Sequence, residues 1–125
     1  MRTFLLILMM TLGMSLNART WHLQSTQIAV VSGAEHLTQK CDVQIILDGT
    51  DKRCIIDSRE TQIFDYQETY SYETKDGFTV IECVATDTHY NKMALVFYFN
   101  PEIETIIITI IYNDITYSYL CYMLD

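Results

Sequence analysis

Four cysteines carry the most definite chemistry in this 125-residue chain: Cys41, Cys54, Cys83 and Cys121. No two of them are two to four residues apart, which is the usual ligand spacing of a structural zinc site, so we expect no metal. An even number of cysteines in a small exported protein favours two disulfides, and three pairings remain open. Buried free thiols are the alternative.

Side chains suited to catalysis are present but form no recognisable arrangement. His22, His36 and His89 lie in separate segments, with no acid or cysteine at the spacing of a catalytic triad or a metal site. There is no G-x-S-x-G nucleophile motif. Nothing in the spacing of the sixteen acidic residues selects two of them for glycoside hydrolysis. We therefore expect no catalytic residue, no cofactor and no enzymatic activity, with a small carboxylate-based hydrolase as the least favoured alternative.

Nine tyrosines are the one excess in the composition, and they indicate binding rather than catalysis. Tyrosine combines a large apolar ring with a hydrogen-bonding hydroxyl group, which suits surfaces that bind proteins or sugars. Tyr70, Tyr72 and Tyr122 are the best candidates for exposed binding residues, because either their neighbours or their strand face is polar. The alternative is that these rings only cover the rim of a small β-core.

The first 18 residues have the three parts of a secretory signal: Arg2, an apolar run over residues 4–12, and small or polar residues up to Ala18. The apolar run is shorter than the roughly 20 residues that a transmembrane helix needs. We therefore expect a helical signal peptide over residues 1–18 with cleavage after Ala18. A single β domain over residues 19–125 would then be secreted or periplasmic, without stable membrane insertion.

Acidic residues outnumber basic ones, and the net charge is −8. Loss of Arg2 with the signal peptide leaves seven basic and sixteen acidic residues, a net charge of −9. This sign opposes contact with nucleic acids and anionic lipids. The expected partner is an unknown protein, a glycan or a small apolar ligand, and not a nucleic acid.

Residues 94–123 hold the densest run of β-branched and aromatic residues and predict three consecutive antiparallel strands. Residues 103–112 and 115–123 flank Asn113 and Asp114, which tolerate the positive φ of a two-residue hairpin turn. One face of this hairpin is mixed, and Ile107, Ile111 and Leu120 interrupt its polar residues. Either a partner or a second sheet covers this face, or the apolar run is an aggregation hazard that export and disulfides must restrain. On the other, core face we expect three opposing pairs: Ile110 with Tyr117, Ile108 with Tyr119, and Ile106 with Cys121.

The loop between residues 93–99 and this hairpin determines which face of the preceding strand points into the core. A connecting loop with an even number of residues places Phe97 and Phe99 on the same face as the isoleucines of the core, whereas an odd loop would turn them toward water. We expect Pro101 and Glu102 to form that turn, with Pro101 at its first central position.

Shorter alternating segments fill the rest of the chain. A change of face near Ser25 predicts a bulge in the first strand. A four-residue loop over residues 48–51 places Ile45 opposite Cys54, and this loop lacks the third carboxylate and the distant glutamate of a calcium site. Together the segments predict an all-β, antiparallel meander of about eight strands forming a small barrel or sandwich. The remaining expected strands are residues 19–31, 40–47, 52–59, 62–67 (continuing over 70–74 across a kink) and 78–86, with a surface loop over residues 32–36.

Four short pieces carry a resemblance to other sequences: Trp21 with residues 25–28 (STQI), residues 41–45 (CDVQI), residues 57–65 (DSRETQIFD) and residues 112–114 (YND). On these pieces the chain resembles a group of short exported proteins of unknown function from gut bacteria and their tailed phages. The resemblance implies a common β-fold and export. Because that group has no assigned activity, it implies no catalytic residue.

These observations favour an exported, non-enzymatic binding or interaction protein that uses a tyrosine-rich surface or a barrel mouth. Barrels of the calycin type, which hold a ligand in their interior, are the nearest analogy at the level of the fold. The alternative is an inhibitor or cap that pairs one of its edge strands with a target protein.

Overall fold

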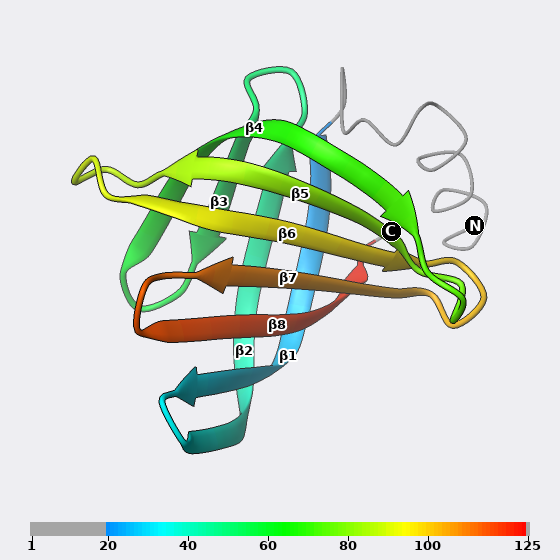
Figure 1. Cartoon of the computed structure of the whole chain (residues 1–125), viewed down its shortest axis with the longest axis horizontal. Coiled ribbons are helices and arrows are strands. Elements are labelled where there is room, and N and C mark those ends of the chain that lie inside the picture. Colours follow the sequence, from blue (N-terminus) through cyan, green and yellow to red (C-terminus); the bar gives the residue numbers. More distant parts are fainter. Residues whose placement is uncertain (1–19, 125) are drawn as a thin grey trace.

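The computed structural model describes residues 20–124, which form a closed barrel of eight antiparallel strands (Figure 1). Each strand pairs with the next one along the chain, and β8 pairs with β1 to close the barrel. The all-β meander is confirmed, and it is a barrel rather than a sandwich. The expected signal peptide lies outside the described residues. The strands are β1 (Thr20–Ser32), β2 (Glu35–Asp48), β3 (Arg53–Asp57), β4 (Thr61–Glu73), β5 (Thr79–Thr86), β6 (Lys92–Asn100), β7 (Thr105–Ile111) and β8 (Ile115–Met123).

The interior of the barrel is filled by apolar side chains. Successive residues of a strand point to opposite faces, so the alternating pattern of each segment directs one set inward. An eight-stranded barrel is just wide enough for its inward side chains to fill. The largest fully buried side chains are Phe64, Phe97, Phe99, Leu23, Ile45, Leu47, Ile56, Ile81, Leu95 and Ile106.

The C-terminal hairpin has the predicted register. The backbone N–H of Tyr112 donates to the carbonyl oxygen of Ile115 at 2.9 Å, which closes the turn at Asn113 and Asp114. On the outer face, the hydroxyl groups of Thr109 and Ser118 are 3.0 Å apart. All three predicted core pairs are present: Ile110 with Tyr117, Ile108 with Tyr119, and Ile106 with Cys121.

The loop between β6 and β7 is longer than predicted. Asn100 pairs with Thr105, so residues 101–104 form a four-residue loop in place of a turn at Pro101 and Glu102 alone. The Asn100 side-chain oxygen accepts from the backbone N–H of Glu102 at 3.1 Å, and Glu104 adopts a φ of 52°. Because the loop still has an even number of residues, Phe97 and Phe99 face the core as predicted.

The register between β2 and β3 differs from the prediction by two residues. Cys54 lies opposite Leu47, not Ile45, because the four-residue loop covers residues 49–52. Asp48 stays in the strand while its carboxylate accepts from the backbone N–H groups of Thr50 and Asp51, at 3.0 and 3.1 Å. Lys52 completes the turn with a φ of 55°. A shift of two residues keeps the same face inward, so Cys54 is buried as expected.

Strand β2 begins five residues earlier than predicted. The expected surface loop over residues 32–36 is a two-residue turn in which Gly33 has a φ of 60°, a conformation that glycine adopts at little cost. The predicted bulge near Ser25 is confirmed, and the predicted kink in β4 is a second bulge, between Glu68 and Tyr70. These bulges let β1 and β4 bend around the barrel.

Candidate functional site

A row of large apolar side chains crosses the outer surface of five neighbouring strands. Tyr72, Val80, Tyr98, Ile107 and Leu120 lie opposite one another from β4 to β8. At roughly 4.8 Å between neighbouring strands, the row is about 19 Å long. We call this row, with Tyr70 and Tyr122 two residues from its ends, the outer tyrosine face.

The three predicted binding tyrosines belong to the outer tyrosine face. Tyr70 is 63% exposed, Tyr72 39% and Tyr122 37%, so the predicted exposure of all three is confirmed. The rings of Tyr70 and Tyr72 are together on β4, with centroids 5.6 Å apart. Tyr122 lies at the other end of the row, on β8 beside Leu120, which is 39% exposed. The structure thus spreads the predicted residues along one surface instead of clustering them.

The outer tyrosine face is a packed layer in its middle part. Val80 points outward, opposite Tyr72 and Tyr98, and is nevertheless fully buried. The rings of Phe78 and Tyr98 meet edge to face, with centroids 6.5 Å apart. Sequence analysis identified Ile107 and Leu120 as apolar interruptions of a polar face but missed Val80 and Tyr98. Only the register across the five strands shows that these residues form one row.

Acidic side chains border one end of this face. The connections from β4 to β5 and from β6 to β7 lie at the same end of the barrel (Figure 1). Desolvation is the largest cause that raises the pKa of Tyr72, and the negative charge of Glu82 is the second. We use the term acidic rim for Glu82, which lies opposite Tyr70, together with the acidic residues at this end of the barrel, where Lys75 is the basic residue. The acidic residues at this end are Glu73, Asp76, Glu102 and Glu104.

A groove lies toward the opposite end of β4, β5 and β6, and its lining includes the core side chains of Tyr66, Ala85 and Met93. Its volume is about 580 Å³. Val84 is exposed in the groove, and Lys92 and Asp65 are its charged side chains. Its lining residues are Asp65, Tyr66, Gln67, Val84, Ala85, Thr86, Lys92, Met93 and Ala94.

No family model matches the chain, and no curated protein or solved structure matches it either. The function is therefore inferred from the chemistry of this surface.

The three histidines lie on separate elements of the barrel. His22 lies on β1, His36 on β2 and His89 between β5 and β6. Among residues 20–124, no group of three or more histidine, cysteine, aspartate or glutamate side chains is placed to hold a metal ion. Within the same residues, no helix is long and apolar enough to cross a membrane.

The four cysteines face the barrel interior as free thiols, so the predicted disulfides are absent. The register gives the reason, because no cysteine lies opposite another on a neighbouring strand. Cys41 and Cys121 both lie beside Ser25 of β1. They belong to β2 and β8, which are about 10 Å apart with β1 between them. A disulfide needs Cα atoms within about 7 Å.

Burial makes three of these thiols poor nucleophiles. Desolvation raises the pKa of Cys83 and of Cys121 to about 12, and it also raises the pKa of Cys54. The thiolate is the reactive form of cysteine, so these side chains are inert at neutral pH. Cys41 is only half-buried, and its sulfur lies 3.6 Å from the Ser25 hydroxyl oxygen.

We predict that iodoacetamide modifies the folded protein at Cys41 first, at neutral pH and without reductant. Cys54, Cys83 and Cys121 should react only after unfolding, because burial excludes both the reagent and the thiolate form. Mass spectrometry of native and denatured samples measures the number of added groups. Denatured, unreduced protein should carry four groups, as the reduced control does. A difference between these two samples would reveal disulfides and contradict the free-thiol arrangement.

Proposed function

We propose that this chain is an exported, non-enzymatic binding protein that holds its partner against the outer tyrosine face. The observation that carries the proposal is the continuous row of aromatic and aliphatic side chains across β4 to β8, exposed at both ends. Exposed apolar patches with a polar border are typical of interaction sites. Tyrosine is enriched among the residues that contribute most to such interfaces.

The packed interior favours an external partner over a ligand carried inside the barrel. Phe97 and Phe99 are fully buried on β6 and stack with ring centroids 6.4 Å apart. Tyr66 packs edge to face against Phe97 from β4, at 5.4 Å. These rings occupy the space that an interior ligand would need. This packing supports a partner that binds outside the barrel.

The partner that fits this face best is another protein, with an apolar centre and a basic border. A row about 19 Å long, on the convex outside of a barrel, is too extended for a small apolar ligand, which proteins usually bind in concave pockets. The acidic rim formed by Glu73, Asp76, Glu82, Glu102 and Glu104 selects against acidic partners and favours basic ones.

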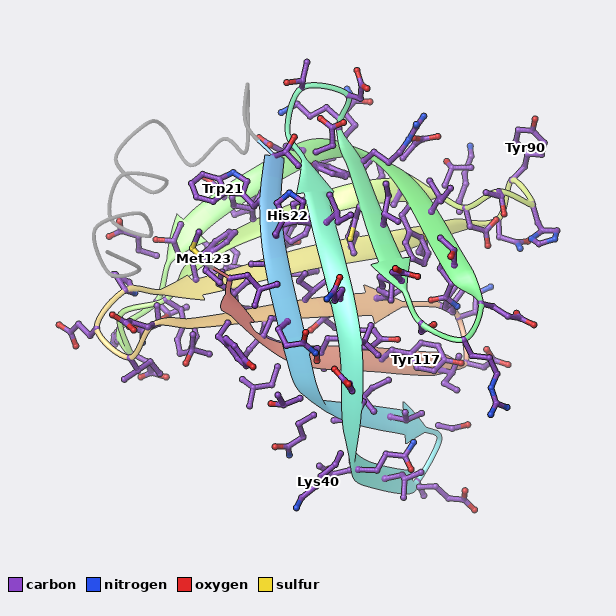
Figure 2. All side chains as sticks on the ribbon, turned by 180° about the vertical axis from the view of Figure 1, so that it is seen from behind. Trp21, His22, Lys40, Tyr90, Tyr117 and Met123 are labelled. Atoms are coloured by element: carbon purple, nitrogen blue, oxygen red, sulfur yellow. The ribbon has the colours of Figure 1, made fainter. Side chains whose placement is uncertain are left out.

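The proposal is tested by affinity capture from the native surroundings, followed by a binding titration with the captured protein. Tyr72→Ala should weaken its affinity at least tenfold, since truncating an interfacial aromatic anchor costs about 2 kcal/mol or more. Tyr90→Ala is the matched control, because Tyr90 is an exposed tyrosine at the tip of the β5–β6 connection, away from the outer tyrosine face (Figure 2).

Salt provides a second measurement on the same pair of proteins. Raising the ionic strength should weaken binding, because it screens the acidic rim from a basic partner. Equal affinity of the Tyr72→Ala and Tyr90→Ala variants would place the binding site elsewhere and overturn the proposal. Tighter binding at high salt would contradict the basic character of the partner.

A further inference from the structure

One stretch of the barrel has an open hydrogen-bonding edge. Strand β2 has fourteen residues, whereas β3 has five and pairs only with residues 44–48 of β2. Residues 35–40 and Val43 pair with β1 on one side, and no strand within residues 20–124 pairs with the other side of residues 35–43. In an antiparallel ladder every second residue directs its N–H and C=O groups away from the partner strand. This stretch of β2 therefore presents a row of unpaired backbone groups.

The open edge is accessible because no strand of the described chain lies beyond it. β1 pairs with β8 up to Ser32 and Ile115, so the teal part of β2, on which Lys40 lies, is the outermost strand at this end of the barrel (Figures 1 and 2). From Glu35 to Lys40 every residue is exposed on both faces of the strand. An exposed edge of this length is a template for pairing with another strand.

We propose that this edge pairs with the same edge of a second copy of the chain, antiparallel and about a two-fold axis at Gln39. The two barrels would then share one continuous sheet. The surface involved belongs to β2 and is separate from the outer tyrosine face, so the inference does not depend on the proposed binding function.

On the inner face of β2, the side chains of one copy are complementary to those of the second copy in this register. Gln39 faces Gln39 of the second copy, so the two amides can donate to and accept from each other. Leu37, which is 56% exposed in the single chain, faces the half-buried Cys41. The pairing therefore covers an exposed apolar side chain with an apolar partner on each side of the axis.

On the outer face, the same register brings polar side chains together. Thr38 lies opposite Lys40, and His36 lies opposite the carboxylate of Asp42. One oxygen of that carboxylate accepts from the side-chain amide of Gln24 at 2.6 Å, which holds it on this face. Each end of the contact thus pairs an imidazole with a carboxylate, and an imidazole N–H group can donate a hydrogen bond to a carboxylate oxygen.

Neighbouring registers are less favourable. A two-fold axis at Thr38 places His36 opposite Lys40, and an axis at Lys40 places two ammonium groups against each other. Like charges directly opposite on paired strands destabilise the pairing. In a symmetric antiparallel pair, side chains that lie opposite each other point to the same side of the sheet. The two-fold axis therefore lies between one residue and the same residue of the second copy, and alternative registers place the axis at other residues of β2. An axis at Gln39 places Leu37 opposite Cys41 and also places His36 opposite Asp42.

The contact between the two copies is small, and its size limits the affinity that we expect for the dimer. Residues 35–43 of each copy fall well below the roughly 20–30 residues per side of a standard interface, so the dimer should be weak and depend on concentration. Sedimentation equilibrium of the purified chain, in reductant and over a wide concentration range, measures its dissociation constant.

Substitutions at His36 and Asp42 test the register as a charge swap. His36→Asp faces Asp42 with a like charge, and Asp42→Lys removes the acceptor that faces His36. Because each change acts at both ends of the symmetric contact, each single variant should raise the dissociation constant, His36→Asp by about tenfold. The double variant with both substitutions places opposite charges across the contact and should recover most of the wild-type affinity.

Two cysteine variants test the same register by disulfide cross-linking, which does not depend on those charges. Gln39→Cys places two thiols opposite each other at the two-fold axis, within the Cα separation that a disulfide accepts, so mild oxidation should link the dimer covalently. Thr38→Cys is the matched control, because its opposite residue is Lys40. The proposal is overturned if the wild type is monomeric at every concentration, if the charge swap restores nothing, or if both cysteine variants cross-link equally. A monomer would leave the edge free for a strand of a different protein.

Discussion

Replacing Phe97 with alanine is expected to lower the free energy of unfolding by about 3–5 kcal/mol. Phe97 is fully buried in the middle of β6, between the rings of Tyr66 and Phe99. Removing its ring leaves a cavity, and β6 cannot shift to fill it because the strand is hydrogen-bonded to β5 on one side and β7 on the other. The loss therefore includes both the apolar transfer energy and the cavity.

Urea titration of the reduced protein, followed by circular dichroism, measures this change. Tyr90→Ala is the control for losing an exposed aromatic ring, since Tyr90 is 87% exposed and its replacement should change the free energy by no more than about 0.5 kcal/mol. A loss below about 1 kcal/mol for Phe97→Ala would contradict a packed barrel interior, because a ring beside an existing void leaves little new cavity.

Alkaline pH is expected to destabilise the fold strongly. Burial raises the pKa of Cys83 and of Cys121 to about 12 in the folded state, compared with an ordinary value of 9.0. Above pH 9 the unfolded chain releases these protons while the folded protein retains them, so the unfolded state gains relative stability. The stabilising contribution is fully present below about pH 9 and is lost between about pH 9 and 12, at up to about 1.4 kcal/mol per pH unit for each thiol.

Urea titrations at a series of pH values from neutral to alkaline, in reductant, measure this slope. Cys83→Ala tests its origin, since the variant lacks one titrating thiol and its free energy of unfolding should fall less steeply above about pH 9, by about 1.4 kcal/mol per pH unit. The packing lost in this variant lowers stability at every pH and leaves the slope unaffected. A variant with the wild-type slope would show that Cys83 does not titrate in this way.

Alternation along each segment predicted which side chains face the core, and the structure confirms it for Cys54, Cys83 and Cys121. Faces were predictable because a register error of two residues leaves them unchanged. Exact loop lengths were not, because side-chain hydrogen bonds decide them. The carboxylate of Asp48 and the amide of Asn100 each retain one more residue in the strand than the turn rules predicted.

The candidate site was partly predictable for the same reason. Polar neighbours identified Tyr70, Tyr72 and Tyr122 as exposed, which needs only local information. Their connection through Val80 and Tyr98 depends on four successive registers and so on every turn between β4 and β8. The disulfide prediction used cysteine number without strand order, and it was wrong because the barrel places no two of the described cysteines opposite each other on adjacent strands.

The pairing of β1 with β8 has a consequence for how the chain folds. Every other strand pair joins neighbours along the sequence and can form as a local hairpin, whereas this one brings Leu23 to Met123. Closing so long a loop lowers the entropy of the chain, and the contacts between β1 and β8 compensate this loss only when both strands meet. We therefore expect the seven hairpin contacts to develop before this last seam, whose closure limits the folding rate and completes the cylinder.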